Sequence, residues 1–174
     1  MRFDWLLFTM AAVSINGVEV TFERIEQLSG FDILHSTLRV RKYNATTTVL
    51  NGSLVSLFAF NNSHKISTIA FHSSLGNQQF NFHPVKLPSA PACISRDMLY
   101  DEYGQYFSNV YNLPEKHVCP IVPQEVTVLD KVFPSGAVPA FMPPGLWKAF
   151  VILSQHDIEL SRFAILCKVT GYFG

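Results

Sequence analysis

Histidine and cysteine are the side chains with which this sequence could bind metals or attack substrates. Its six histidines are His35, His64, His72, His83, His117 and His156. None lies two or four residues from another, which are spacings that metal sites often use. The sequence also has no His-Glu-x-x-His, no Gly-x-Ser-x-Gly and no phosphate-binding glycine motif. A serine, a histidine and an aspartate could still meet in the folded chain, but the pattern predicts a protein that is not an enzyme and has no metal or cofactor.

Three cysteines suggest a disulfide and one spare thiol. They are Cys93, Cys119 and Cys167, and an oxidising compartment would pair two of them. Three pairings are possible. We favour Cys93 with Cys119, because the short segment between them carries a predicted helix that a bridge would hold in place. Cys167 lies in an apolar strand pattern, which is typical of a buried thiol.

The first residues and three sequons point to secretion. Arg2 precedes an apolar run from Trp5 to Ile15 that ends in small residues, a pattern typical of a signal peptide. The run is shorter than the ~20 residues that span a bilayer; an amphipathic first helix and a membrane anchor are the alternatives. We predict a signal peptide over residues 1–17 and an extracellular protein.

Glycosylation sequons begin at Asn44, Asn51 and Asn61. Asn51 is followed by glycine, and Asn-Gly between two β-rich runs is a strong hairpin signal. We therefore expect Asn51 at a hairpin tip and rank it as the best glycosylation site. Alternatively, these asparagines only serve turns and strand faces.

The composition argues against nucleic-acid binding. Hydrophobic residues make up 48% of the 174 residues and charged residues only 15%, below the usual quarter. The net charge is zero and the sequence has no basic run. It therefore gives no reason to expect nucleic acid or an anionic membrane as a partner. No later segment is long and apolar enough to span a membrane. The length fits one domain, which we place at residues 18–174.

Most of the predicted elements that would position the residues discussed above are β-strands. Period-two patterning and turn residues predict a mainly β fold, a two-sheet sandwich or cup with one helix over residues 95–111. Ser95 is the expected N-cap of that helix. The expected strands cover residues 18–23, 38–49, 54–60, 64–71, 79–82, 125–133, 146–153 and 160–170.

Aromatic residues are more numerous than a small sandwich needs. With 15 Phe, 6 Tyr and 2 Trp, the surplus could line a lipid pocket; the alternative is a well-packed core. The proline-rich loop over residues 133–145 is a candidate wall or gate, or an ordinary loop on the core. The candidate cavity residues are Phe58, Phe60, Val138, Phe141, Met142, Trp147, Val151, Phe163 and Ile165.

Several segments, in order, resemble a known family. They are residues 41–44, 49–53, Cys93 with the helix after it, Ser108-Asn109, Cys119-Pro120 and residues 143–148. Over roughly residues 38–150 the chain resembles an insect family of small secreted proteins that includes the CheB chemosensory group. The resemblance implies a β-cup related to lipid-recognition domains of the ganglioside-activator type, with a hydrophobic cavity between two sheets. It also implies secretion into sensory hairs and the sensing of pheromones or other hydrophobic chemicals.

Two functional hypotheses follow. The first is a secreted protein that carries or presents a hydrophobic small molecule or lipid, with a receptor or channel as a further partner. The second is a secreted protein–protein accessory or co-receptor without a ligand cavity. A filled interior and an exposed apolar patch would favour the second hypothesis.

Overall fold

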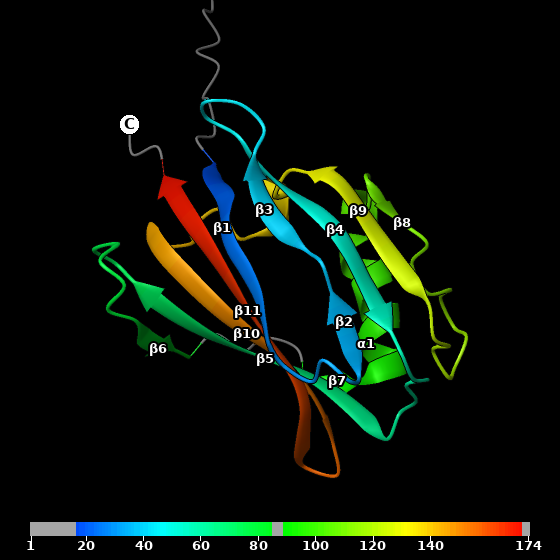
Figure 1. Cartoon of the computed structure of the whole chain (residues 1–174). Coiled ribbons are helices and arrows are strands. Elements are labelled where there is room, and N and C mark those ends of the chain that lie inside the picture. The colour runs from blue at the N-terminus through cyan, green and yellow to red at the C-terminus, as the bar shows by residue number, and fades with distance from the viewer. Residues whose placement is uncertain (1–16, 85–88, 172–174) are drawn as a thin grey trace, which may run out of the picture.

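The computed structural model describes residues 17–84 and 89–171 and is mainly β (Figure 1). Two antiparallel sheets face each other, and one α-helix lies beside them. The prediction of a two-sheet β-sandwich with one helix is therefore confirmed. Most of the predicted signal peptide, residues 1–16, lies outside the described residues.

The first sheet contains the long strands. Its order is β1 (Val18–Ser29), β11 (Ile158–Gly171), β10 (Gly145–Gln155), β5 (His64–Ser73) and β6 (Asn81–His83), and β7 (Ala90–Pro91) also pairs with β5. A tight turn joins β10 to β11, in which His156 and Asp157 have φ of 49° and 63°. The strands expected at residues 146–153 and 160–170 are therefore sheet neighbours joined by this turn.

The second sheet is built around β4. Its order is β2 (Leu34–Ser36), β4 (Thr48–Ser56), β9 (Glu125–Lys131) and β8 (Val110–Tyr111), and β3 (Arg39–Lys42) also pairs with β4. Thr48 joins this sheet to the first, because its hydroxyl donates to the Phe22 carbonyl oxygen at 2.7 Å.

The hairpin predicted at Asn51-Gly52 is wrong, because both residues lie inside β4. The turn falls earlier, where the Asn44 side-chain oxygen accepts from the backbone N–H groups of Thr46 and Thr47 at 3.0 and 2.8 Å. Gly52 has a φ of 122° at a register shift between β4 and β9. A Cβ at Gly52 would also collide with the Thr37 carbonyl, so the glycine serves a bulge and a close approach instead of a turn.

Helix α1 (Ala92–Tyr103) is followed by a short 3₁₀ turn, η1 (Gly104–Tyr106). It starts three residues earlier than predicted, directly after Pro91, and Ser95 is therefore not its N-cap. The Ser95 hydroxyl donates instead to the Ala90 carbonyl oxygen at 3.0 Å. A disulfide joins Cys93 in the first turn to Cys119, with 5.9 Å between the Cα atoms, and confirms the favoured pairing.

One end of the sandwich is filled. Its buried residues are Val20, Phe22, Ala70, Trp147, Cys167 and Val169. Phe133, Val138 and Met142 from the proline-rich loop pack against this cluster. Cys167 is the free thiol, buried as predicted, and burial together with the nearby Glu23 raises its pKa to about 12. At neutral pH this thiol therefore stays protonated and unreactive.

Candidate ligand cavity between the two sheets

A cavity of about 560 Å³ occupies the other end of the sandwich. The first sheet contributes Ile25, Ile66, Thr68, Val151, Leu153, Ser161, Phe163 and Ile165 to its wall. The second sheet and its connections contribute Leu34, Leu38, Leu54, Ser56, Gln124 and Val126. Helix α1 and the segment after it add Ala92, Ser95, Arg96, Leu99, Tyr100, Leu113, Pro114 and Ile121. The wall is almost entirely apolar, and its volume falls in the range of small-molecule pockets, roughly 300–1,000 Å³.

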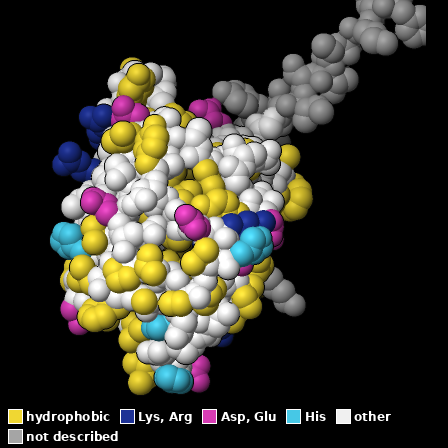
Figure 2. Space-filling model, turned by 90° about the vertical axis from the view of Figure 1, so that its right-hand side faces the viewer, with side chains coloured by type: hydrophobic (Ala, Val, Ile, Leu, Met, Phe, Trp, Pro, Cys, Tyr) yellow, Lys and Arg dark blue, Asp and Glu magenta, His cyan; other side chains and the backbone are white. Residues whose placement is uncertain are grey.

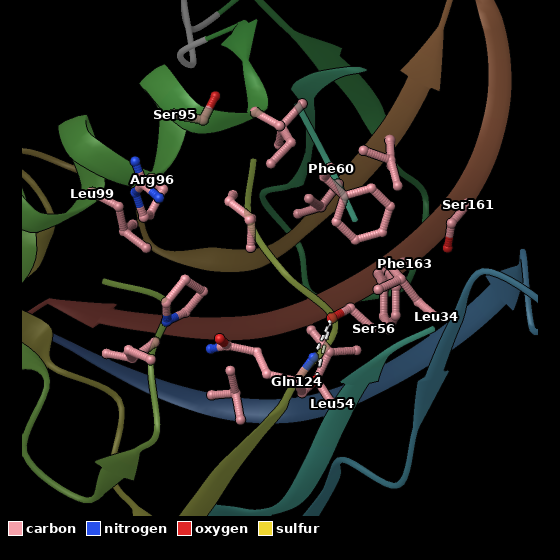
Figure 3. A pocket seen from close by; sticks show the side chains of 18 of the residues that line it. Leu34, Leu54, Ser56, Phe60, Ser95, Arg96, Leu99, Gln124, Ser161 and Phe163 are labelled. Carbon is pink, nitrogen blue, oxygen red and sulfur yellow. Dashed lines mark hydrogen bonds between the residues drawn. The ribbon is translucent and has the colours of Figure 1, made fainter. Parts of the chain in front are cut away.

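Strand alternation explains why these residues face the cavity. In β10, Val151 and Leu153 point inward and line it, and Ile152 between them points outward. In β11, Ser161, Phe163 and Ile165 follow the same rule. Helix α1 and the segment before β9 form part of the wall between the sheets, so the sheets do not close on each other at this end (Figure 3).

Most polar groups in the wall are satisfied by backbone groups. Ser56 accepts from the Gln124 backbone N–H at 2.9 Å (Figure 3). The Ser161 hydroxyl donates to the Ser29 carbonyl oxygen at 2.9 Å, and the Tyr100 hydroxyl donates to the Pro114 carbonyl oxygen at 2.9 Å. These bonds leave the apolar parts of the residues to form the lining.

Arg96 is the only charged residue among the described residues that line the cavity. It is only 7% exposed. Its Nε donates to the Asp97 carboxylate at 2.8 Å, and its Nη1 donates to the Val118 carbonyl oxygen. Asp97 also accepts from the His117 backbone N–H at 3.0 Å, and this bond and Arg96 lower the pKa of its carboxyl. Arg96 and Asp97 thus tie α1 to the segment that leads to Cys119.

The cavity reaches the surface beside the helix. Leu99 lines the cavity and is also 45% exposed, so it stands at the opening. Figure 2 views the molecule from the right-hand side of Figure 1, where α1, β8 and β9 lie. Hydrophobic side chains are interspersed with polar ones on this face (Figure 2).

The structure brings some of the predicted cavity residues together and separates others. Phe60, Val151, Phe163 and Ile165 line the cavity. Phe58 lies in the β4–β5 connection and is 56% exposed, and Phe141 is 86% exposed. Neither of these two rings lines the cavity, because each projects toward solvent.

Trp147, Val138 and Met142 also lie outside the cavity wall, in the filled end. The Trp147 ring stacks on His72 with 4.5 Å between centroids, and its Nε1 donates to the Pro143 carbonyl oxygen at 2.9 Å. These contacts hold the proline-rich loop on the filled core. The expectation that this loop forms a cavity wall is therefore corrected, and the ordinary-loop alternative describes it.

Sequence reasoning missed the contribution of the helix and of β2 to the wall. The helical spacing of Leu99, Tyr103 and Phe107 is the available sequence signal that α1 has an apolar face. No sequence signal distinguished Arg96 from a surface arginine, because its burial depends on the packing of residues 113–119 against the helix.

The sequons differ in their surroundings. Asn44 and Asn61 are exposed, and each side-chain oxygen accepts from the hydroxyl group of its own sequon, Thr46 at 3.2 Å and Ser63 at 2.6 Å. The Asn51 Nδ2 donates to the Asp130 carboxylate at 2.9 Å, and the Asn51 Oδ1 accepts from the Asp130 backbone N–H at 3.0 Å. Its predicted place at a hairpin tip is corrected, since it pairs with Arg39 within the sheet.

The cavity wall offers little for catalysis. Its described residues include no histidine, no carboxylate and no cysteine thiol that could act as a base or a nucleophile. Within residues 17–84 and 89–171, no group of three or more His, Cys, Asp or Glu is placed to hold a metal ion. No helix in this part of the chain is long and apolar enough to cross a membrane. Searches of protein-family models and of curated proteins find no match to this chain.

Proposed function

We propose that this protein is a secreted binding protein that carries or presents a hydrophobic small molecule in the cavity between its two sheets. The observation that carries the proposal is the apolar cavity of about 560 Å³. Protein interiors rarely contain voids larger than a water molecule, and an empty apolar cavity costs stability through lost packing contacts. A ligand that fills the cavity would restore those contacts.

Two further observations support an extracellular binding role. The Cys93–Cys119 bridge is compatible with an oxidising compartment. The resemblance to CheB-like proteins supports a lipid, hydrocarbon or pheromone as the ligand and a receptor or channel as the partner that receives it.

The test is direct. The full chain is expressed in insect cells, and the secreted protein is extracted with organic solvent and analysed by mass spectrometry. Displacement of a fluorescent fatty probe is then measured. We expect a co-purified apolar molecule or a displaceable probe. Absence of both would contradict the proposal.

Matched variants locate the binding. Val151→Trp places a large ring in the cavity, and Ile152→Trp places the same ring on the outer face of the same strand. The first variant should abolish probe binding and the second should leave it intact. Equal loss in both variants, or in neither, would argue against this cavity as the site.

A protein–protein accessory role is the second candidate. The observation that favours it is a group of rings on the outer face of the first sheet, where Phe71 lies 5.9 Å from Phe82 and 5.7 Å from Phe150. Phe82 is 62% exposed on a short edge strand. Loss of a partner from a pull-down with Phe82→Ser, together with an empty cavity, would support this role over the first.

A further inference from the structure

Resting on the proposed function, we propose that Arg96 selects a ligand with one apolar chain and a carboxylate head. Arg96 is charged, more than nine-tenths buried, and part of the cavity wall. Burial of a charge is costly unless partners compensate it. The other charged residues of the described chain lie outside this wall, so Arg96 is the one charged group that the described residues place in it.

The guanidinium has donors to spare. It carries five N–H groups, and the structure occupies two of its nitrogens, Nε with Asp97 and Nη1 with the Val118 carbonyl. Nη2 makes no hydrogen bond with the residues that the structure describes. A carboxylate can accept from two donors of the guanidinium fork at once, so it matches the unused side of Arg96 better than a hydroxyl group does.

The two contacts that Arg96 already makes also prepare it for a ligand. They fix the side chain against Asp97 and residue 118, so little conformational freedom remains to be lost on binding. Asp97 compensates the charge of Arg96 in the empty protein, and its second oxygen lies 3.5 Å from the His117 ring. Asp97 engages Nε and the Val118 carbonyl engages Nη1, so Nη2 stays available to an anion.

The geometry also sets the direction of the ligand. Arg96 and Leu99 lie on the helix side of the cavity, and Phe60, Phe163 and Leu34 lie across from them (Figure 3). Leu99 is one helical turn from Arg96 and stands at the opening. The head group therefore binds near the opening, and the apolar chain extends between the sheets toward Phe163.

The experiment compares ligands that share a chain and differ in the head. Delipidated full-length protein is titrated with palmitate, hexadecanol and methyl palmitate in competition with a fluorescent fatty probe. We expect palmitate to bind about tenfold or more tightly than hexadecanol, since a charge-assisted pair exceeds a neutral hydrogen bond. Equal affinities would overturn the assignment of Arg96 and leave the proposed function standing, whereas binding of neither the probe nor any of the three compounds would overturn both.

Variants separate Arg96 from general charge effects. Arg96→Gln should remove the preference for palmitate and keep the affinity for hexadecanol, and Arg96→Lys should retain part of the preference. Lys116→Gln is the control, because Lys116 pairs with Asp101 and does not line the cavity; it should leave the preference unchanged. A preference that survives Arg96→Gln, or that disappears in Lys116→Gln, would contradict the proposal.

Photolabelling of the unaltered protein does not depend on how the variants fold. Palmitate with a photoreactive group beside the carboxylate should label peptides from α1 or residues 113–118. The same group at the far end of the chain should label peptides from β10 or β11. Head-group labelling of the β11 peptide that contains Phe163 would overturn the proposed orientation.

Discussion

Strands β1, β10 and β11 run through two regions of this molecule that are packed in different ways. At the end near Trp147 and Phe22, side chains from both sheets and from the proline-rich loop fill the interior. At the end near Leu153 and Phe163, the same strands face a cavity of about 560 Å³. The inward period-two pattern is the same in both halves, so the difference comes from what lies across from the strands.

In the filled half, the loop inserts Phe133 beside Phe22, with 5.0 Å between the ring centroids, and Trp147 stacks on His72. In the hollow half, α1 and the segment before β9 take part in the wall between the sheets. The comparison teaches that one sandwich can contain both a packed core and an apolar cavity, because a loop fills one end and a helix forms part of the wall of the other.

The largest difference should appear on truncation of one ring in each half. Trp147→Ala removes a buried ring that packs against His72 and His83 and should lower the free energy of unfolding by about 3–5 kcal/mol. Phe163→Ala removes a ring that borders empty space and should cost only about 1–2 kcal/mol. Denaturant unfolding of both variants measures the difference, and equal losses would mean that the two halves are packed alike.

The disulfide should matter almost as much, and it belongs to the hollow half. Its two cysteines are 26 residues apart and enclose α1, and chain entropy assigns such a loop roughly 3–4 kcal/mol. Cys93→Ser and Cys119→Ser should therefore be secreted poorly and to the same extent. Secreted yield and peptide mapping without reduction test this, and a linked peptide that contains Cys167 would refute the pairing.

Ligand should stabilise the protein by filling the hollow half. At a concentration of 100 times Kd, a bound ligand adds about 2.7 kcal/mol, which raises Tm by roughly 5–10 °C for a domain of this size. Val151→Trp should show no such rise, and Ile152→Trp should show all of it. Thermal unfolding with palmitate, or with whichever apolar compound the extract contains, gives the comparison.

Substitution of Cys167 should destabilise the filled half by less than truncation of Trp147. Cys167→Ser places a hydroxyl group in the apolar cluster and should cost about 1–2 kcal/mol without preventing secretion. In the unaltered protein the thiol should resist alkylation at pH 8, because burial raises its pKa to about 12. Alkylation at the same rate in native and unfolded protein would show that the cluster opens readily.

Loss of the glycans should have the smallest effect on stability. We expect glycans only on the sequon asparagines that are exposed. Asn44 lies at the filled end and Asn61 in the β4–β5 connection toward the hollow end, and both are exposed. Asn51 is bound by Asp130 within the sheet. We expect Asn44→Gln and Asn61→Gln to change gel mobility and Asn51→Gln to leave it unchanged. Unchanged mobility of the unaltered protein after glycosidase digestion would remove the prediction of glycosylation altogether.

The sequence predicted which strand residues point inward better than it predicted what lies across from them. Alternation along β10 and β11 is a local signal, and it placed Val151, Phe163 and Ile165 on the inner face correctly. It did not show whether that face meets a packed loop or a cavity, because this depends on segments far away in the chain. Trp147 and Phe163 both point inward, but Trp147 meets the packed cluster and Phe163 meets the cavity.

Other errors arose where one residue type serves two purposes. Asn-Gly is typical of hairpin turns, yet Gly52 sits at a bulge because the Thr37 carbonyl approaches it closely. The actual turn depends on the Asn44 side chain and has no glycine. Arg96 had no signature of its own, since its burial follows from the fold of residues 113–119 against the helix.

The Cys93–Cys119 bridge should couple the proposed ligand binding to the oxidation state of the two cysteines. Its closed ring contains both α1 and residues 113–118, and these are the segments that flank the opening of the cavity. If intact wall segments favour the ligand, linkage requires that the ligand favours the intact bridge by the same factor. A loaded protein should therefore resist a thiol reductant longer than an empty one, and a reducing environment should weaken the hold on the cargo.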